Sequence, residues 1–290
     1  FDENKMIIVP NGINLNIFNV DFYEKLITKK KSPMVMGIVN ITPDSFYDGG
    51  QHKSVKSYIK HIEKIINEGA DIIDLGACSS RPGATPISLK EEERRLLPVL
   101  EKTKQEFPHI PVSIDTYRYQ IAEKAILYGA QLINDIYIEK DKKKMFSVIA
   151  KYNIPYVLMH MQGNPKNMQK KIQYIDFETE IMMFFKNNIK ELKEKGIYNI
   201  ILDPGFGFGK TLNQNYNLIN MITKIKQLNY PILTGLSRKS MISQGLNTTS
   251  KNALTGTIAA NTICLMNGAS IIRVHDVQEA KETIKIFNLT

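Results

Sequence analysis

The sequence predicts an α/β protein that folds as a single (β/α)8 TIM barrel. Eight short apolar runs alternate with longer segments in which apolar residues recur at helical spacing. The runs are too apolar to leave one face in water, which is typical of parallel strands covered on both sides. Eight units of even spacing favour closure into a barrel over the alternative, an open doubly wound sheet.

The strands and helices are expected in regular order after a short N-terminal extension, residues 1–33. Residues 1–5 precede Met6 and are interpreted as a candidate cloning remnant; the extension has no predicted function. The barrel is expected over 34–290, with no second domain. Its strands are predicted at 34–41, 71–76, 111–115, 131–136, 155–160, 199–203, 231–236 and 270–275. Its helices are predicted near 54–68, 88–107, 117–128, 141–152, 176–195, 212–228, 251–267 and 277–287.

Local punctuation supports these boundaries. Four glycines stand where predicted helices should end, a position that favours a left-handed backbone: Gly69, Gly129, Gly196 and Gly268. Ser88 and Glu91 have the spacing of a capping box ahead of an apolar-periodic run.

Composition narrows the functional classes. The 290 residues are 43% hydrophobic and 23% charged, which suits a globular protein with a sizeable core. No run is long and apolar enough for a membrane span, and no signal pattern opens the chain, so a cytoplasmic location is expected. The two cysteines cannot form a disulfide framework or a thiolate metal cage.

The net charge of +9 does not predict nucleic-acid binding. Much of the excess lysine lies in short polar runs such as 29–31 and 140–144, which are typical of solvated loops and helix faces. No RNA-binding aromatic pattern or zinc-finger spacing accompanies them. A mild positive field would attract a small anionic substrate instead.

One stretch, residues 201–210, stands out as a candidate site. An apolar run ends at Asp203 and breaks at Pro204, and three glycines then alternate with Phe206 and Phe208. We expect a strand that delivers a carboxylate to its tip, followed by a loop whose exposed aromatic rings form a floor for a flat ligand. The stretch ends like a nucleotide-binding P-loop, but Pro204 occupies the position of the leading glycine and excludes that interpretation.

Polar residues close nearly every predicted strand, and in a barrel these ends surround one mouth. Asp115, Asn134 and Asp203 offer acceptors and amides suited to the N–H-rich edge of a planar heterocycle. The cationic or donor groups suit an anion such as a phosphate: Lys239, Arg273 and His275. Alternation along a strand places the last two on the same face.

These strand ends carry a family resemblance. The segments that carry it are Asn40-Ile-Thr-Pro-Asp-Ser-Phe with Asp48-Gly-Gly50, Ser80-Arg-Pro-Gly83, Asn134-Asp135, Met159-His-Met-Gln-Gly-Asn-Pro165, Asp203-Pro-Gly-Phe-Gly-Phe-Gly209, Ser237-Arg-Lys239 and Arg273-Val-His-Asp276. In this order, from about Met34 to the C-terminus, they resemble the dihydropteroate synthase family.

The resemblance implies a TIM barrel that condenses 6-hydroxymethyl-7,8-dihydropterin diphosphate with 4-aminobenzoate, giving 7,8-dihydropteroate and diphosphate. It also implies a Mg2+ requirement, a homodimer and inhibition by sulfonamides. Asn40 would help bind Mg2+. The pterin would be held by Asp115, Asn134, Met159, Asp203 and Lys239; the diphosphate by Ser80, Arg273 and His275; and the aminobenzoate near Pro82, Phe208 and Ser240. Arg81 is a further expected substrate-binding residue. Of these, Asp115, Asp203, Lys239, Arg273 and His275 are the expected catalytic residues. One departure is visible: many members have Gly-Glu-Ser-Thr-Arg-Pro in the second loop, where this chain has Ala77-Cys78-Ser79-Ser80-Arg81-Pro82.

Chemically, a dissociative substitution is expected. Neutralising its charge makes diphosphate a good leaving group, and the conjugated pterin methylene can then carry positive charge near Asp115 and Asp203. A neutral arylamine needs no strong base to attack such a carbon. Two rival assignments remain open at this point: a pterin-binding methyltransferase domain and a non-catalytic basic binding module.

Overall fold

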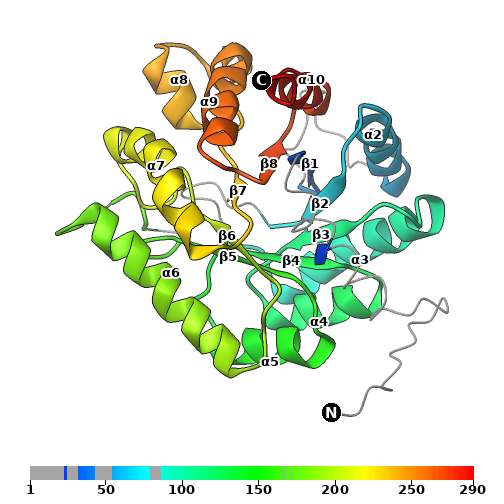
Figure 1. Cartoon of the computed structure of the whole chain (residues 1–290). Helices are drawn as coiled ribbons and strands as arrows, with labels where there is room; N and C mark the ends of the chain where they lie inside the picture. The colour runs from blue at the N-terminus through cyan, green and yellow to red at the C-terminus, as the bar shows by residue number, and fades with distance from the viewer. Residues whose placement is uncertain (1–22, 25–31, 43–53, 79–85, 166, 171) are drawn as a thin grey trace.

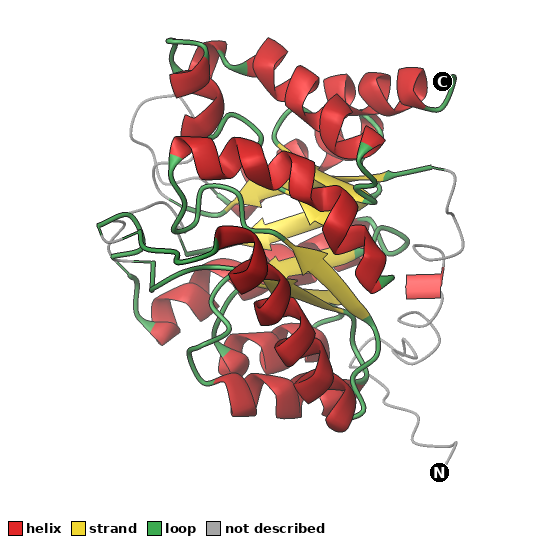
Figure 2. Ribbon diagram, turned by 60° about the vertical axis from the view of Figure 1, so that its left-hand side comes forward, coloured by secondary structure: helices red, strands yellow, loops and turns green. Residues whose placement is uncertain are grey.

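Eight parallel strands lie at the centre of the molecule, and helices surround them (Figures 1 and 2). The computed structural model describes residues 23–24, 32–42, 54–78, 86–165, 167–170 and 172–290. The strands are β1 (Met34–Asn40), β2 (Ile72–Gly76), β3 (Val112–Asp115), β4 (Leu132–Asp135), β5 (Tyr156–Met159), β6 (Ile200–Asp203), β7 (Leu233–Thr234) and β8 (Ile271–Val274). Each lies inside the range predicted from the sequence.

The long helices also match their predicted segments. They are α2 (Val55–Asn67), α3 (Leu89–Glu106), α4 (Tyr119–Leu127), α5 (Lys142–Tyr152), α6 (Phe177–Glu194), α7 (Leu212–Ile225), α9 (Leu254–Met266) and α10 (Val277–Phe287). A short helix, α8 (Ser240–Gly245), and two 3-10 turns, η1 (Lys226–Leu228) and η2 (Ser250–Asn252), complete the described elements. The Ser88 hydroxyl accepts from the Glu91 amide at 3.1 Å, which is one of the two hydrogen bonds of the predicted capping box; the Glu91 carboxylate pairs with Arg94 and Arg95 instead.

The strand order β6-β5-β4-β3-β2-β1-β8-β7 follows the chain around a barrel. Between the two ends of this order, closure depends on one parallel bridge, Leu202 with Ile232. The Leu202 amide donates to the Pro231 carbonyl at 2.9 Å beside that bridge. The fold is therefore the predicted (β/α)8 barrel, with its least regular seam beside the two-residue strand β7.

Two cores form because side chains alternate along each strand. Outward-facing residues pack against the helices in the larger core. Inward-facing residues fill the lower barrel: Met34, Met36, Ile72, Leu132, Val157, Ile201, Leu233 and Ile271. Tyr23, which precedes the first strand, joins this inner core and donates from its hydroxyl to the Ile200 carbonyl at 2.9 Å. The N-terminal extension, for which the sequence predicted no role, thus contributes a side chain to the interior of the barrel.

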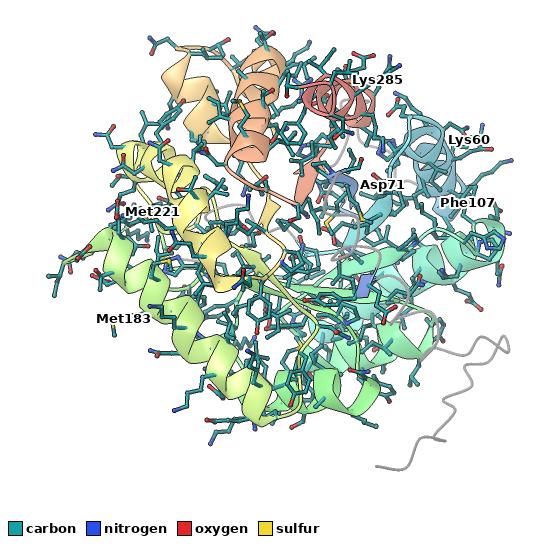
Figure 3. All side chains as sticks on the ribbon, in the orientation of Figure 1. Lys60, Asp71, Phe107, Met183, Met221 and Lys285 are labelled. Carbon is teal, nitrogen blue, oxygen red and sulfur yellow. The ribbon has the colours of Figure 1, made fainter. Side chains whose placement is uncertain are left out.

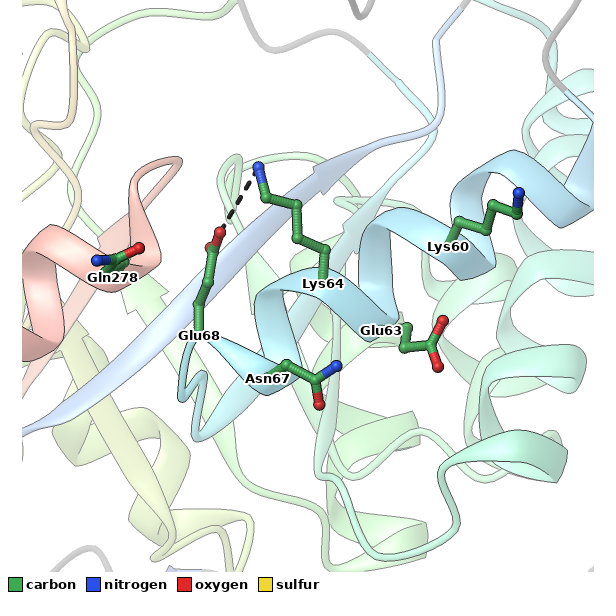
Figure 4. A pocket seen from close by; sticks show the side chains of 6 residues that line it. All are labelled: Lys60, Glu63, Lys64, Asn67, Glu68 and Gln278. Carbon is green, nitrogen blue, oxygen red and sulfur yellow. Dashed lines mark ion pairs between the residues drawn. The ribbon is translucent and has the colours of Figure 1, made fainter.

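The outer surface carries polar contacts and some exposed apolar side chains. Asp71, labelled in Figure 3, accepts from the Val35 amide and from the Lys281 ammonium, at 2.8 and 3.0 Å, and so ties α10 to the first strands. Met183 projects outward from α6 (Figure 3). A shallow depression between α2 and α10 is lined by charged and amide side chains, with Lys64 and Glu68 paired at 3.5 Å (Figure 4). Among the described residues, no helix combines the length and apolarity needed to traverse a bilayer.

Candidate active site

The inward face of the sheet changes from apolar to polar toward the carboxyl ends of the strands. Below are the methionines and aliphatic side chains of the inner core. Above them, on inward-facing positions of β2, β3, β4, β6 and β8, come Asp74, Asp115, Asn134, Asp203 and Arg273, and all but the last are buried. Four of these are predicted site residues, and the fifth, Asp74, is not among the residues predicted from the sequence.

Arg273 joins two carboxylates in the barrel interior. Its Nε lies 2.7 Å from Asp74 Oδ2, and its Nη2 lies 2.9 Å from Asp115 Oδ2. Asn134 Nδ2 donates to the same Asp74 oxygen at 3.2 Å. The structure therefore brings β2, β3, β4 and β8 together through one hydrogen-bonded cluster. A signal for Asp74 was present in the sequence, because it is the one acid in the otherwise apolar strand Ile72–Gly76.

Two acceptors in this cluster have no hydrogen-bond partner among the described residues: Asp74 Oδ1 and Asn134 Oδ1. Buried polar atoms are nearly always paired in folded proteins, so unpaired ones require an explanation. Both belong to inward-facing side chains near the upper ends of their strands. A ligand bearing several N–H groups would satisfy them, as the sequence predicted for Asn134.

Electrostatic interactions set the protonation of the site. Burial raises the pKa of Asp115 to about 7, even though the guanidinium of Arg273 opposes the shift. Burial also raises the pKa of Asp203, against the charge of Lys239. Withdrawal from water lowers the pKa of Lys239 to about 8, with Asp203 acting in the opposite direction. In this low-dielectric space, each acid and each cation therefore reduces the pKa shift that burial causes in its oppositely charged neighbour.

The loop after β6 differs from the prediction in one respect. Phe206 is fully buried in the outer core, and Phe208 is 8% exposed. The prediction of exposed aromatic rings was wrong, because the neighbouring strand ends supply a hydrophobic environment that the sequence pattern did not reveal. Phe208 packs in a small cluster with Ile136, Met159, Met161 and Met168. This places the predicted site residues Met159 and Phe208 together.

Close backbone packing explains the glycines of that loop. A Cβ at Gly205, where φ is +73°, would lie 2.0 Å from the His160 carbonyl oxygen. One at Gly209 would lie 2.6 Å from the Gln162 carbonyl oxygen. Only glycine permits this approach of the β6 loop to the end of β5. The amide of Gly205 donates to Asp203 Oδ1 at 2.8 Å and fixes that carboxylate at the strand tip.

The predicted cationic residues lie on the last two strand ends. Lys239 donates to the Phe206 carbonyl at 2.6 Å, and its ammonium lies 4.5 Å from the centre of the Phe208 ring. His275 follows β8 and is exposed; its Nδ1 lies 3.1 Å from Ser237 Oγ. Ser240 begins the short helix α8. Arg238 instead forms a bidentate pair with Asp276, at 2.8 and 2.9 Å.

Some predicted residues cannot be placed. Ser80, Arg81 and Pro82 lie outside the described residues, as does most of the loop after the first strand. Asn40 is the last residue of β1 and is partly exposed. Within the described residues, no three His, Cys, Asp or Glu side chains cluster as metal ligands.

The fold and this ring of polar strand ends define a barrel enzyme of the pterin-binding class. The family model described as "Pterin binding enzyme" matches residues 36–275. The dihydropteroate synthase of Escherichia coli K12 is 43% identical over 260 residues, 89% of this chain and 92% of that protein.

Solved structures agree. A Yersinia pestis dihydropteroate synthase with a sulfonamide drug complex matches at a TM-score of 0.85 and 41% identity, covering 90% of this chain and 95% of that one. A Xanthomonas albilineans dihydropteroate synthase with 4-aminobenzoic acid matches at 0.83 and 35%, covering 90% and 93%. This chain belongs to the dihydropteroate synthase family.

Proposed function

We propose that this barrel condenses 6-hydroxymethyl-7,8-dihydropterin diphosphate with 4-aminobenzoate and that the polar mouth described above performs the reaction. The observation that supports it most directly is the Asp74–Arg273–Asp115 cluster with its unpaired acceptors, inside a chain that matches synthases over most of its length. The Xanthomonas protein's complex with 4-aminobenzoic acid supports the choice of arylamine.

The pterin is assigned to the barrel interior. Asp74 and Asn134 would accept from its N–H groups, and Asp115, beside Arg273, offers a further acceptor. Asp203 and Lys239 would meet it from the other side of the mouth, above Met159. Because the pKa of Asp115 is raised to about 7, its carboxyl group can gain or lose a proton near neutral pH. It can therefore respond to a change in the charge of the pterin.

Bond cleavage is proposed to be dissociative. The carbon–oxygen bond to diphosphate breaks first, and the carboxylates of Asp115 and Asp203 stabilise the positive charge left on the conjugated methylene. The arylamine nitrogen then attacks that carbon, and its proton is released to solvent. Arg273 and His275 would bind the departing diphosphate, with Ser80 as a further predicted contact.

Mg2+ is proposed as the cofactor. It would supply charge neutralisation for the leaving diphosphate. Mg2+ commonly keeps several waters and binds through substrate phosphates, so a single protein ligand is chemically sufficient. The amide of Asn40, on the inward face of β1 at the mouth, fits that part.

The aminobenzoate is assigned to the outer part of the mouth. Phe208 under the Lys239 ammonium and Ser240 at the start of α8 would contact it, with Pro82 predicted alongside. The sulfonamide complex of the Yersinia protein supports the proposal that sulfonamides compete for this position. A cytoplasmic location stays a prediction.

The reaction is tested by following diphosphate release from the pterin substrate with and without 4-aminobenzoate. We expect release that requires both the arylamine and Mg2+ and that stops when a chelator removes the metal. Release independent of the arylamine would contradict the synthase proposal and favour simple hydrolysis. Pterin binding without any turnover would favour a binding module.

Arg273 needs a test that separates chemistry from stability, because it neutralises two buried acids. Removing one partner of a buried ion pair costs roughly 3–5 kcal/mol, so Arg273→Ala should lower the free energy of unfolding strongly. Arg273→Lys keeps the charge but loses the two-pronged contact. We expect it to lower turnover more than affinity for the free pterin, measured by steady-state kinetics and calorimetry. Equal losses of both would assign Arg273 a structural role.

A further inference from the structure

Lys210 ends the loop that follows β6, and its ammonium turns back underneath that loop. The residue is 3% exposed. Its Nζ lies 3.0 Å from His160 Nδ1 and 2.9, 3.0 and 3.2 Å from the carbonyl oxygens of Gly205, Phe208 and His160. An ammonium has three N–H groups, and this geometry gives each of them an acceptor.

Burial lowers the pKa of Lys210 to about 7 and holds that of His160 well below its usual range, with the Lys210 charge adding to the effect on His160. His160 is therefore neutral, and its Nδ1 faces the Lys210 nitrogen. A buried amine surrounded by backbone carbonyls is costly unless every donor is used. The free-energy cost of burying Lys210 is therefore offset by its hydrogen bonds to the backbone.

These hydrogen bonds fix the backbone of the loop after β6. Side-chain donors bind every carbonyl oxygen from residue 205 to residue 209. Lys210 donates to Gly205 and Phe208, and Lys239 donates to Phe206. From the other side, Gln169 Nε2 donates to Gly207 at 2.6 Å, and the Tyr174 hydroxyl donates to Gly209 at 2.9 Å. A loop of alternating glycines has little intrinsic rigidity, so these donors fix its path.

Three groups assigned to substrate depend on that path. The Gly205 amide holds Asp203. Phe208 carries the ring beneath the Lys239 ammonium, and Lys239 itself is anchored on the Phe206 carbonyl. Lys210 donates to the backbone carbonyls of Gly205 and Phe208, and none of its hydrogen bonds goes to a side chain assigned to substrate.

We propose that Lys210 is a positioning residue that holds the Gly205–Phe208 backbone, and through it Asp203, Phe208 and Lys239, in the geometry that binds both substrates. The proposal deepens the function proposed above and rests on it. Lys210 acts through the loop and contacts no reacting atom. Small displacements of binding groups reduce binding and turnover steeply, so the effect of losing this anchor should exceed a general loss of stability.

The chain offers a matched control. Lys104 on α3 is also buried, at 6% exposure, and its Nζ donates to the carbonyls of Pro108 and Ile110 and to Gln131 Oε1 at 3.0–3.1 Å. These partners precede β3 and β4, so Lys104 lies at the opposite, amino-terminal end of the barrel. Lys104→Met should cost stability in the same way as Lys210→Met but at a distance from the site.

The experiment compares Lys210→Met, Lys104→Met and the unmodified protein by steady-state kinetics, thermal unfolding and hydrogen exchange of the peptide covering 203–210. We expect Lys210→Met to raise KM for both substrates by about tenfold or more and to speed exchange in that peptide. Lys104→Met should leave both KM values within about twofold, because the two lysines are far apart. Unchanged KM values and exchange in folded Lys210→Met would overturn the proposal.

Two further measurements keep the outcome decisive. If Lys210→Met does not fold, Lys210→Arg replaces it: the charge is retained but the donors are displaced, so KM should still rise by about fivefold or more. If the KM values of Lys210→Arg equal those of the unmodified protein, the proposal is overturned. If the unmodified protein shows no arylamine-dependent turnover, the proposed function fails, whereas the exchange comparison still decides whether Lys210 orders the loop.

Discussion

At the scale of single residues, the mouth of the barrel is defined by ionisable groups that are paired but not fully satisfied. Arg273 neutralises Asp74 and Asp115, and the Gly205 amide holds Asp203. The unpaired oxygens of Asp74 and Asn134 leave two acceptors in the cluster for a further donor. A purely structural ion-pair cluster would be expected to satisfy its own acceptors.

Asp203→Asn tests the acid at the centre of the predicted site. The substitution keeps the size and the acceptor for Gly205 but removes the charge opposite Lys239 and the charge proposed to stabilise the transition state. We expect pterin diphosphate binding to weaken by about tenfold or more, since hydrogen bonds to charged groups are worth roughly 1.5–3 kcal/mol. Calorimetric titration measures it, and near-normal binding would remove Asp203 from the pterin site.

Asp135 provides a pH test outside the site. It faces the helices, accepts from the Tyr156 hydroxyl and the Tyr137 amide at 2.7 and 2.9 Å, and burial raises its pKa from 3.8 to about 6. Between these pH values the native state binds a proton at Asp135 that the unfolded state has lost. The contribution of Asp135 to stability is therefore fully present below about pH 4 and is lost as pH rises to about 6.

Asp135→Asn should remove that contribution. Between pH 4 and 6, the free energy of unfolding should fall less in the variant than in the unmodified protein, by on the order of 2 kcal/mol. Denaturant unfolding at several pH values measures the difference between the two proteins, which cancels the titration of Asp115 and the other buried acids. Parallel curves would show that Asp135 titrates normally.

At the scale of elements, side chains alternate between the two faces of the strands. One face joins the outer core, and in β2, β4, β6 and β8 the other changes from an apolar residue to a polar one toward the carboxyl end. The loops then differ in how they are held, from glycine contacts at Gly205 and Gly209 to the Thr211–Gln214 capping box that begins α7. The residues preceding the first strand also contribute, through Tyr23 in the inner core.

Tyr23 gives that segment a measurable role. Removing a buried aromatic side chain typically costs roughly 3–5 kcal/mol, so Tyr23→Ala should lower the free energy of unfolding by about 3 kcal/mol. Tyr23→Phe loses only the hydrogen bond to Ile200 and should cost about 1 kcal/mol. Chemical denaturation of both variants checks the order. Stability unaffected by Tyr23→Ala would show that the side chain does not pack in the barrel in solution.

At the scale of the whole molecule, two adjacent helices carry exposed apolar side chains on the surface. Helix α9 contains no charged residue from Leu254 to Met266, yet Ile263 and Met266 are 47% and 72% exposed. Ile286 and Leu289, at the end of α10 and just beyond it, are 65% and 80% exposed, and α9 and α10 lie side by side (Figure 1). We propose that this face forms the homodimer expected from the family resemblance, since an exposed apolar patch on a helix usually marks a surface that another protein covers.

Met266→Asp should therefore weaken dimerisation. A charge at the centre of an apolar interface costs several kcal/mol, so we expect monomers at about micromolar concentration. Met183→Asp on α6 is the control, because Met183 is similarly exposed, at 54%, and lies away from this face (Figure 3). Sedimentation velocity measures the oligomeric state. A monomeric unmodified protein, or equal behaviour of the two variants, would contradict the proposal.

The sequence by itself determined the order of strands and helices, the closure of eight units into a barrel and most residues of the mouth, because period, glycine stops and polar strand ends are local signals. Asp115, Asn134, Asp203, Lys239 and Arg273 could be found from position alone. Only the tertiary structure decided that Phe206 is buried, that Asp74 completes the arginine cluster, that Lys210 anchors the β6 loop and that Tyr23 enters the barrel. Each of these depends on contacts between residues distant in the chain, and burial and pairing at such distances leave no periodic trace in a single sequence.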